Sequence, residues 1–445
     1  MVLSHLVFWL RPVQGDEAYA YIKYITCPFW DTLSLYTPNN HIFYNLAAKI
    51  FCAVGGGTIY APRLPAFFAG LIIFPLNYKF VSLLYKNRRV AFLATMFLFS
   101  FPVFINYSVA ARGYVFLILF TLVSFYSLLR LMRGGSVKWW FFYAGACVLG
   151  IYAIPVMVYS IGAGLLWFFL SLDKHRRASF ILPFLMVLVV VAFLAGLLYL
   201  PVIIRSGVKA IIANSFIKPD TLPGVLSGLF TLPVDLYREW HLFLPASFIL
   251  LLLFGFVTAL LMPSKYRRGN AVLIAAVALA TGAVTFIVFK PPYLRSLLFA
   301  LPFYAAVAAY GVVRVCVSVR ANFYLAAFIV FMSVQASILF SPLVKTADLK
   351  SAPQIMVTLT SLLKPGDLVV ASTPADAILP FYFYINKISL NYFRANTAYT
   401  GNIFIVVKKV PGNNSDLNEN LLGADKAKAS KTFIFEDATV YFFKI

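Results

Sequence analysis

The first 342 residues hold only seven acidic side chains, and two of these, Asp16 and Glu17, are neighbours. Aromatic residues follow directly in Ala18-Tyr19-Ala20-Tyr21. A carboxylate that is partly shielded from water beside such rings can accept the proton of an acceptor hydroxyl, so the pair is a candidate general base. The alternative is that both acids face lipid headgroups or balance the N-terminus of a surface helix.

Two arginines stand beside long apolar runs, Arg112 in Ala111-Arg112-Gly113-Tyr114 and Arg295 after Pro291-Pro292-Tyr293-Leu294. An arginine within the hydrocarbon of a bilayer costs about 2.5 to 3.5 kcal/mol, so such a residue usually has a partner or a task. A planar guanidinium suits a phosphate group, to which it donates two parallel hydrogen bonds. The alternative is that both side chains reach out to lipid headgroups.

Two further polar residues precede apolar helices. Asn40-His41 follows a Pro and an Asn that favour a turn, and a helix is predicted to start near His41. Arg63 stands in Pro62-Arg63-Leu64-Pro65, at the start of an apolar run. A single histidine beside aromatic residues is more often packed or solvated than functional, and Arg63 has the alternative role of anchoring a helix end at the headgroups.

Several classes of chemistry are not indicated. No group of acidic or histidine residues has metal-ligand spacing, and the four cysteines contain no CxxC pair, so we expect packing residues, with a Cys27–Cys52 disulfide as the alternative. The glycine run at 55–57 lacks the lysine of a phosphate-binding loop. We therefore expect no metal, no cofactor and no nucleotide as energy source.

The composition is that of an integral membrane protein. Of the 445 residues, 62% are hydrophobic, 17% are aromatic and only 12% are charged, against about 25% charged residues in soluble domains. The net charge of +22 comes from small basic clusters between apolar runs rather than from a continuous stripe. This pattern favours membrane topology and gives no indication of nucleic-acid binding.

A helix needs roughly 20 mostly apolar residues to cross a bilayer, and ten such runs follow a short N-terminal one, which predicts eleven transmembrane helices. The ten runs are 61–85, 90–108, 113–131, 139–153, 155–172, 180–204, 242–262, 271–289, 294–316 and 323–341. The N-terminal run, Val2 to Leu10, has about half the length of a crossing, which predicts that the given sequence starts inside that helix.

Basic clusters set the expected orientation, because Lys and Arg collect in cytoplasmic loops. Five clusters fall on one side if 139–172 is a hairpin of two short helices: 86–89, 130–138, 174–177, 265–268 and 314–320. The N-terminus is then cytoplasmic, and the segments 11–60, 106–113, 205–241, 290–293 and 343–445 are outside. The expected domains are a membrane domain at 1–342 and an extracytoplasmic α/β domain at 343–445.

The last hundred residues alternate polar runs with β-rich segments at 368–371, 403–407, 432–435 and 440–443, which predicts the small α/β domain. Ser351 is a candidate helix cap, with Pro353 in the first turn. The long connection at 205–241 is expected to cover the entrance for a lipid, since loops of this length often act as lids.

Taken in order, these motifs resemble the GT-C superfamily of membrane glycosyltransferases, in the branch of protein O-mannosyltransferases and aminoarabinose transferases. The resemblance rests on short motifs spread over most of the membrane part: Asp16-Glu17-Ala18-Tyr19, Asn40-His41, Arg63-Leu64-Pro65, Tyr107-Ser108, Ala111-Arg112-Gly113-Tyr114, and Arg295 with Pro302. It implies a GT-C-like fold with a trailing soluble domain.

The resemblance also implies an activity, the inverting transfer of a sugar from a polyprenyl-phosphate donor to an acceptor at the outer face of the membrane. The acceptor would be a glycan, a lipid or a protein, and the location the bacterial inner membrane. The roles implied for the matching residues are catalysis by Asp16 with Glu17 as its companion, lipid-phosphate binding by Arg112, Arg295 and Lys290, and shaping of the site by Asn40, His41, Arg63 and Tyr114.

Two features depart from the family pattern. Many bacterial relatives carry a glutamate two residues before the arginine of the turn, where this chain has Ala110, and the first helix is short. Two other classes of function therefore stay open: a transporter or flippase of lipid-linked saccharides, and a catalytically silent scaffold that binds a lipid. A transporter would be expected to place ionisable residues near the middle of the membrane, whereas here they gather at one end of the spans.

Overall fold

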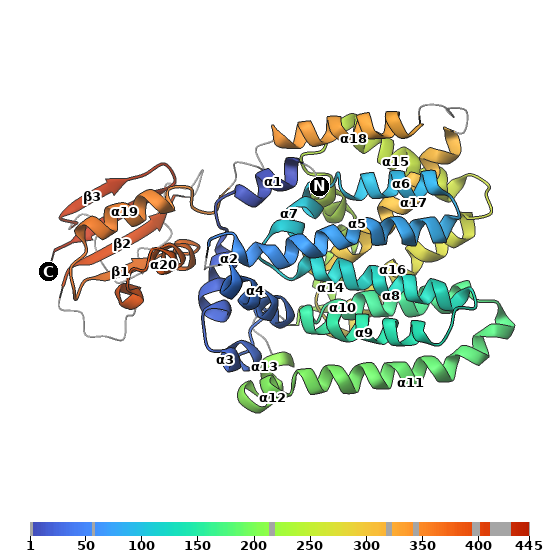
Figure 1. Ribbon diagram of the computed structural model, residues 1–445, viewed down its shortest axis with the longest axis horizontal. Coiled ribbons are helices and arrows are strands. Elements are labelled where there is room, and N and C mark those ends of the chain that lie inside the picture. Colours follow the sequence, from blue (N-terminus) through green and yellow to red (C-terminus); the bar gives the residue numbers. More distant parts are fainter. Residues whose placement is uncertain are drawn as a thin grey trace. The chain divides into compact units, whose positions relative to one another are not determined.

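The computed structural model describes residues 3–55, 58–212, 219–316, 323–340, 347–393, 401–409 and 429–444 (Figure 1). The chain divides into two compact units. The first, here called the helical unit, consists of 1–9, 29–47 and 63–344, and the second, here called the mixed unit, of 10–28, 48–62 and 345–445. The segments 10–28 and 48–62 thus group with the C-terminal part, and the division at residue 342 stays a prediction.

The helical unit is built from helices that follow the apolar runs of the sequence. Its elements are α1 (Leu3–Leu10), α3 (Phe29–Ser34), α4 (Ile42–Val54, which continues into the mixed unit), α5 (Leu64–Tyr85), α6 (Arg88–Leu98), α7 (Pro102–Val109), α8 (Tyr114–Met132), α9 (Lys138–Ala153), α10 (Met157–Ser171), α11 (Lys174–Leu198), α12 (Leu200–Ser206), α13 (Val208–Ile212), α14 (Leu222–His241), α15 (Ala246–Leu261), α16 (Arg267–Val288), the 3₁₀ helix η4 (Leu294–Ala300), α17 (Leu301–Val315) and α18 (Phe323–Leu339).

Five helices among the described residues are long and apolar enough to cross a membrane, at Ala61–Tyr85, Tyr114–Met132, His175–Leu198, Arg267–Val288 and Leu294–Val315. A bent pair, α6 with α7, makes a sixth. Other predicted spans form apolar helices of 10–17 residues, shorter than a full crossing requires. Counted by length and apolar composition, the described helices do not reach the predicted eleven spans. They are still enough to identify an integral membrane protein.

Side-chain exposure separates helices that face lipid from helices that fill the core. In α11 only 17% of the most apolar window is buried, and Val189 and Phe193 are each 68% exposed. The span at Leu294–Val315 is completely buried by the same measure. Helix α11 packs along α9 (Figure 1). The exposed apolar side chains of α11 would be unfavourable in water, so we infer that they contact lipid.

The predicted span at 90–108 is wrong in one respect, because it is broken into α6 and α7, which meet at 72°. Pro102 lies in the first turn of α7, and the residue before a proline is disfavoured in helical conformation, so Phe101 is extended with φ −74° and ψ 121°. The bend ends one helix and starts the next. The turn that contains Arg112 follows directly after α7.

Two glycines let α15 and α17 approach backbone to backbone. A Cβ atom built on Gly311 would lie 1.8 Å from the carbonyl oxygen of Gly255, and one built on Gly255 would lie 2.3 Å from that of Ala308. Small residues of this kind allow close helix packing in membranes. Since α17 continues directly from η4, this contact also fixes the element that carries Arg295.

We predict opposite effects for two glycine-to-alanine substitutions. Gly311→Ala should destabilise the protein by about 1–3 kcal/mol, because backbone atoms must move apart. Gly145→Ala, in α9, should stabilise it by about 0.5–1 kcal/mol, because a Cβ there meets nothing within 4 Å and alanine favours the helix. Thermal unfolding in detergent measures both. Equal shifts of the two melting temperatures would contradict the backbone contact.

The mixed unit contains a four-stranded sheet in the order β1-β2-β4-β3. The strands are β1 (Leu368–Ala371), β2 (Ile403–Lys408), β3 (Lys431–Ile434) and β4 (Ala438–Phe443), so all four predicted β-rich segments form strands. β1 pairs with β2 in parallel, and the other two pairs are antiparallel. Helix α20 (Ala375–Ile385) lies in the crossover from β1 to β2, as parallel pairing requires.

The other helices of the mixed unit are α2 (Gly15–Ala20), the π-helix η1 (Tyr21–Ile25), η2 (Ala61–Arg63, which ends at the helical unit), α19 (Ala352–Leu362) and the 3₁₀ helix η6 (Leu390–Phe393). Ser351 precedes α19 with proline in its first turn, as predicted, but it does not cap the helix with its side chain. The Ser351 hydroxyl donates instead to the carboxylate of Asp437, which ties α19 to the turn before β4.

Candidate active site

The turn between α7 and α8 is held by His41. The backbone N–H of Gly113 donates to His41 Nδ1 at 2.9 Å, so the neutral ring carries its proton on Nε2. A Cβ at residue 113 would lie 2.9 Å from Nδ1 and 3.1 Å from the Cβ of His41, which explains the glycine. His41 therefore positions the turn, and with it Arg112; its predicted role in shaping a substrate site stays a prediction.

A second contact links Arg112 to the segment before α4. Arg112 is 3% exposed, and its Nη2 donates to Asn39 Oδ1 at 3.1 Å. Asn40, the next residue, is an internal brace: its amide donates to the carbonyls of Thr32 at 3.0 Å and Leu35 at 2.5 Å. Asn39 thus contacts the arginine directly, whereas Asn40 holds the loop from which Asn39 and His41 project.

Arg295 joins this cluster through aromatic rings. Its guanidinium carbon lies 5.5 Å from the ring centroids of both Tyr114 and Tyr293, within the range of cation–π attraction. Tyr114 in turn packs edge-to-face on His41, with centroids 5.1 Å apart. Lys290 lies 5.8 Å from the Tyr293 ring. The structure therefore brings Arg112, Arg295, Lys290, Tyr114 and His41 together in the helical unit; we call these five residues the cationic cluster.

The electrostatics of the cluster keep His41 neutral. Burial lowers the pKa of His41 well below its usual 6.5, and the positive charges of Arg112 and Arg295 lower it further. Both guanidinium groups therefore lie close to His41, and both also act on Tyr107, together with the carboxylate of Glu239. Two cations beside one carboxylate leave a net positive charge, which suits an anion with more than one oxygen.

The depressed pKa predicts a pH-dependent stability. Below about pH 6.5 the unfolded chain binds a proton at His41 that the folded protein does not, so stability falls as the pH drops, by up to about 1.4 kcal/mol per pH unit. His41→Asn keeps an acceptor for the Gly113 N–H and removes the titrating ring. Thermal unfolding at pH 7.5 and 5.5 should show a smaller loss in the variant than in the wild type, and parallel losses would contradict the assignment.

Arg63 has a different environment from the two cluster arginines. It is 2% exposed, and its Nη1 donates to the carbonyl oxygen of Trp9 at the end of α1. This contact connects the start of α5 with the first helix. Arg63 therefore acts on the fold around α1, and its predicted role of shaping the site stays a prediction.

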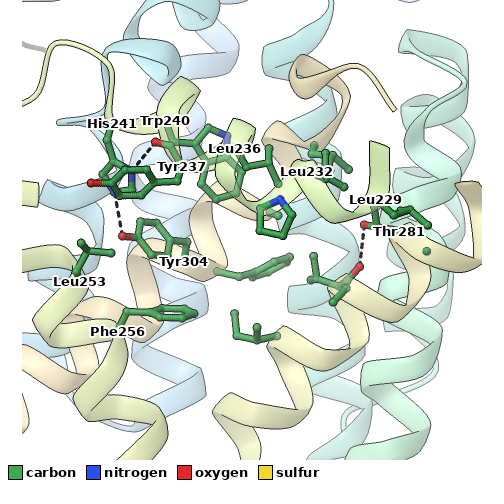
Figure 2. Close-up of a pocket in the computed structure, with 18 residues that line it drawn as sticks. Leu229, Leu232, Leu236, Tyr237, Trp240, His241, Leu253, Phe256, Thr281 and Tyr304 are labelled. Carbon is green, nitrogen blue, oxygen red and sulfur yellow. Dashed lines mark hydrogen bonds between the residues drawn. The ribbon is translucent and has the colours of Figure 1, made fainter. Parts of the chain in front are cut away.

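A largely apolar cavity of about 440 Å³ lies in the helical unit between α14, α15, α16, η4 and α17 (Figure 2). One end carries a polar side chain, His241. Its Nδ1 lies 2.8 Å from the Tyr237 carbonyl oxygen, and its Nε2 lies 3.0 Å from the Tyr304 hydroxyl. The cavity wall includes Leu297 of η4, two residues after Arg295. The apolar cavity is thus lined in part by η4, the 3₁₀ helix that also carries Arg295.

The acidic pair lies in the mixed unit. Glu17 is 4% exposed, and its Oε2 accepts the backbone N–H of Gln14 at 3.0 Å, so it caps α2. Asp16 is only partly buried. The Gly15 N–H donates to Asp348 Oδ2 at 2.7 Å, a contact that no motif in the sequence indicates. The neighbouring acids therefore differ: Glu17 holds the helix start, and Asp16 is the more exposed carboxylate.

Cysteine and metal chemistry find no support among the described residues. None of the four cysteines forms a disulfide, so the alternative of a Cys27–Cys52 disulfide is wrong. Within the described ranges, no group of three or more His, Cys, Asp or Glu side chains is arranged to hold a metal ion.

Residues 39–203, which include His41, Arg63, Arg112 and Tyr114, match a family model described as dolichyl-phosphate-mannose-protein mannosyltransferase. No match is found among the curated proteins. Two similar solved structures are those of ArnT from Cupriavidus metallidurans, in the apo state (TM-score 0.64, 11% identity) and bound to undecaprenyl phosphate (TM-score 0.61, 13% identity). Each similarity covers 98% of this chain and 96% of the ArnT chain.

An oligosaccharyltransferase from Archaeoglobus fulgidus is also similar, with a TM-score of 0.50, 11% identity, and coverage of 91% of this chain and 67% of the other. At these identities the similarity concerns the fold. Together with the family match, it confirms the resemblance that the short motifs indicated. The chain has the fold of the GT-C superfamily of membrane glycosyltransferases, and residues 39–203 carry the sequence pattern of its mannosyltransferase branch.

Proposed function

We propose that the protein transfers a sugar from a polyprenyl-phosphate donor to an acceptor at the outer face of the membrane, with inversion at the anomeric carbon. The observation that carries this proposal is the cationic cluster, in which two arginines act on the same buried histidine and one of them, Arg295, lies over the Tyr114 ring. Because Arg112 is almost completely buried, a bound anion would be largely removed from water. A lipid phosphate beside apolar helices meets this requirement.

The comparisons support the same donor class. The family model that matches residues 39–203 is named for a dolichyl-phosphate-mannose enzyme, and the ArnT structure contains undecaprenyl phosphate. The dolichyl phosphate of the first and the undecaprenyl phosphate of the second are both phosphates of long polyisoprenoid lipids. The cluster residues of the turn lie within the matched range, whereas Arg295 and Lys290 lie outside it.

In the proposed reaction Asp16 accepts the proton of the acceptor hydroxyl, whose oxygen attacks the anomeric carbon. The bond between that carbon and the phosphate oxygen breaks, and its electron pair leaves with the phosphate. Arg112, Arg295 and Lys290 stabilise the negative charge that develops there, an electrostatic effect that usually dominates in such sites. The glycosyl phosphate itself supplies the free energy, so no nucleotide or other cofactor takes part.

The apolar cavity suits the hydrocarbon part of this donor. Its volume of about 440 Å³ lies within the usual range for ligand pockets, about 300–1,000 Å³, and apart from the polar end at His241 its walls are mostly leucine, phenylalanine and other apolar residues. Helix α14, which forms one wall, belongs to the connection for which the sequence predicted a lid. We propose that the isoprene units nearest the phosphate enter here and that α14 covers them.

The proposed orientation follows from the basic clusters. The N-terminus is cytoplasmic, and the segments with Asp16, His41, Arg112 and Arg295 face outward, together with residues 343–445. In a bacterial cell this membrane would be the inner membrane. The acceptor is then a glycan, lipid or protein of the cell envelope.

The test is an assay of the purified full-length protein in liposomes with radiolabelled polyprenyl-phosphate sugars and, separately, nucleotide sugars, in the presence of an envelope extract as acceptor. The proposal predicts release of polyprenyl monophosphate in equal amount with the labelled product, and no use of nucleotide sugars. Movement of intact donor across the bilayer without transfer would indicate a flippase instead. Donor binding without either event would indicate a silent scaffold.

A further inference from the structure

The mixed unit contains a cleft that the proposed function does not use. It has a volume of about 980 Å³ and is formed by three segments: η1 with the residue after it, the end of α4, and residues 384–391, which include the last two residues of α20. Tyr21, Lys49, Tyr384, Lys387 and Asn391 are among the residues that line it. Polar and apolar atoms contribute about equally to its walls, unlike those of the cavity in the helical unit.

The charge of this cleft has one sign. Lys49 and Lys387 line it, and no acidic residue is among the described residues of its wall. Lys49 is partly buried, and its ammonium donates to the carbonyl oxygens of Ile25 at 2.7 Å and of Cys27, so its charge is fixed in place. A cleft with two cations and no carboxylate favours an anionic ligand.

Lys387 occupies a backbone position at which glycine is the usual residue. Its φ is +58°, and the N–H groups of Lys387 and Ile388 donate to the carbonyls of Tyr384 at 3.0 Å and Phe383 at 2.9 Å. This is the hydrogen-bond pattern that ends a helix with a left-handed residue, for which an L side chain is unfavourable. A lysine in this unfavourable backbone conformation is explained if its positive charge binds a ligand. The alternative is that it only interacts with the C-terminal end of α20.

The remaining groups are those that bind sugars. Tyr384 is 42% exposed and presents ring surface at one side of the cleft, whereas Tyr21 is only 3% exposed and packs edge-to-face on Tyr384, with centroids 5.9 Å apart. Thr26, Ser389 and Asn391 add hydroxyl and amide groups, which can donate and accept hydrogen bonds. The exposed Tyr384 ring can cover the apolar face of a sugar, and the polar side chains beside it can bind sugar hydroxyls, so the cleft fits a saccharide of one to a few rings.

We infer that this cleft binds the acceptor, and that the acceptor is a saccharide with a phosphate or carboxylate group. The inference rests on the proposed function, because it assigns a second substrate to the same enzyme. The connection is the helical segment itself: α2 runs directly into η1, so Asp16 lies five residues before Tyr21. At about 1.5 Å per residue this is roughly 8 Å along the axis, about the width of one or two sugar rings.

A protection experiment tests the inference without any transfer reaction. Cys52 lines the cleft and is free, and burial raises the pKa of its thiol to about 11, so alkylation by N-ethylmaleimide is slow and can be followed at pH 8.5. The full-length protein in detergent is treated with N-ethylmaleimide in the presence of maltose 1-phosphate, maltose or inorganic phosphate. Mass spectrometry of the peptide with Cys52 gives the concentration of each compound for half-protection.

The inference predicts protection by maltose 1-phosphate at a concentration at least ten-fold lower than for maltose or phosphate alone. Lys387→Gly should remove this ten-fold preference. The glycine suits the left-handed backbone, so the melting temperature should stay the same or rise, which excludes misfolding as the cause. Lys364→Ala, an exposed lysine outside the cleft, is the matched control and should behave as wild type.

Equal protection by maltose and maltose 1-phosphate, or an unchanged preference in Lys387→Gly, would overturn the inference. Protection by inorganic phosphate as strong as that by maltose 1-phosphate would also do so, since the rings would then have no role. These results are independent of the donor. A protein that binds the phosphorylated sugar but transfers nothing would leave this inference standing and contradict the proposed function.

Discussion

Replacing Asp16 by asparagine should lower sugar transfer by about 10²–10⁴-fold, the usual contribution of a general base. The amide has nearly the same shape as the carboxylate but cannot accept the proton of an acceptor hydroxyl. Protein level and thermal stability should stay unchanged, since Asp16 is only partly buried. The measurement is product formation from a labelled polyprenyl-phosphate sugar by equal amounts of the two proteins.

Glu17→Gln is the matched control for this prediction. The glutamine oxygen can still accept the Gln14 N–H that Glu17 now accepts at 3.0 Å, so α2 should keep its start. If Asp16 is the base and Glu17 its structural companion, the control loses far less activity than Asp16→Asn. A large loss in Glu17→Gln together with normal turnover in Asp16→Asn would exchange the two roles.

Replacing Arg295 by alanine should raise the KM for the lipid donor by about 10- to 100-fold, because a hydrogen bond to a charged group contributes roughly 1.5–3 kcal/mol. The same change should have little effect on the KM for the acceptor. Arg295→Lys should give an intermediate value, since lysine keeps the charge but loses the planar group that now lies over Tyr114 and Tyr293. Initial rates at varied donor concentration separate these cases.

Arg205→Ala controls for the general loss of an arginine. Arg205 forms an ion pair with Asp31, and both side chains are partly exposed, so the pair contributes little to stability. Its donor KM should equal that of the wild type. A donor KM in Arg295→Ala that is no higher than in Arg205→Ala would remove Arg295 from the phosphate site.

Much of the fold could be predicted because it depends on local signals. The four strands follow β-rich segments bounded by turns, and the start of α4 directly after His41 follows the Pro and Asn residues before it. The turn with Arg112 was placed correctly because an arginine between two apolar runs has few stable positions. The packing of Arg295 on Tyr114 was not predicted, and the roles assigned to both residues stay predictions.

Other features depend on contacts between distant segments, which single-sequence reasoning does not supply. The bend between α6 and α7 was missed because Pro102 lies inside an otherwise continuous apolar run. Segment 10–28 groups with the C-terminal part through contacts such as that of Gly15 with Asp348, 333 residues later. The side chain of Asn40 donates to two carbonyls of its own loop, a contact that the sequence did not indicate, and its predicted role in shaping the site stays a prediction.

The proposed transfer requires that the cationic cluster face the outer side of the membrane, and one span offers a direct test. Tyr293 and Cys316 flank the span Leu294–Val315 and are both exposed. A membrane-impermeant maleimide is added to intact cells that express Tyr293→Cys, and each site is read by mass spectrometry. Labelling at residue 293, with Cys316 labelled only in inverted vesicles, is the predicted result; labelling of Cys316 in intact cells, with residue 293 protected, would contradict it.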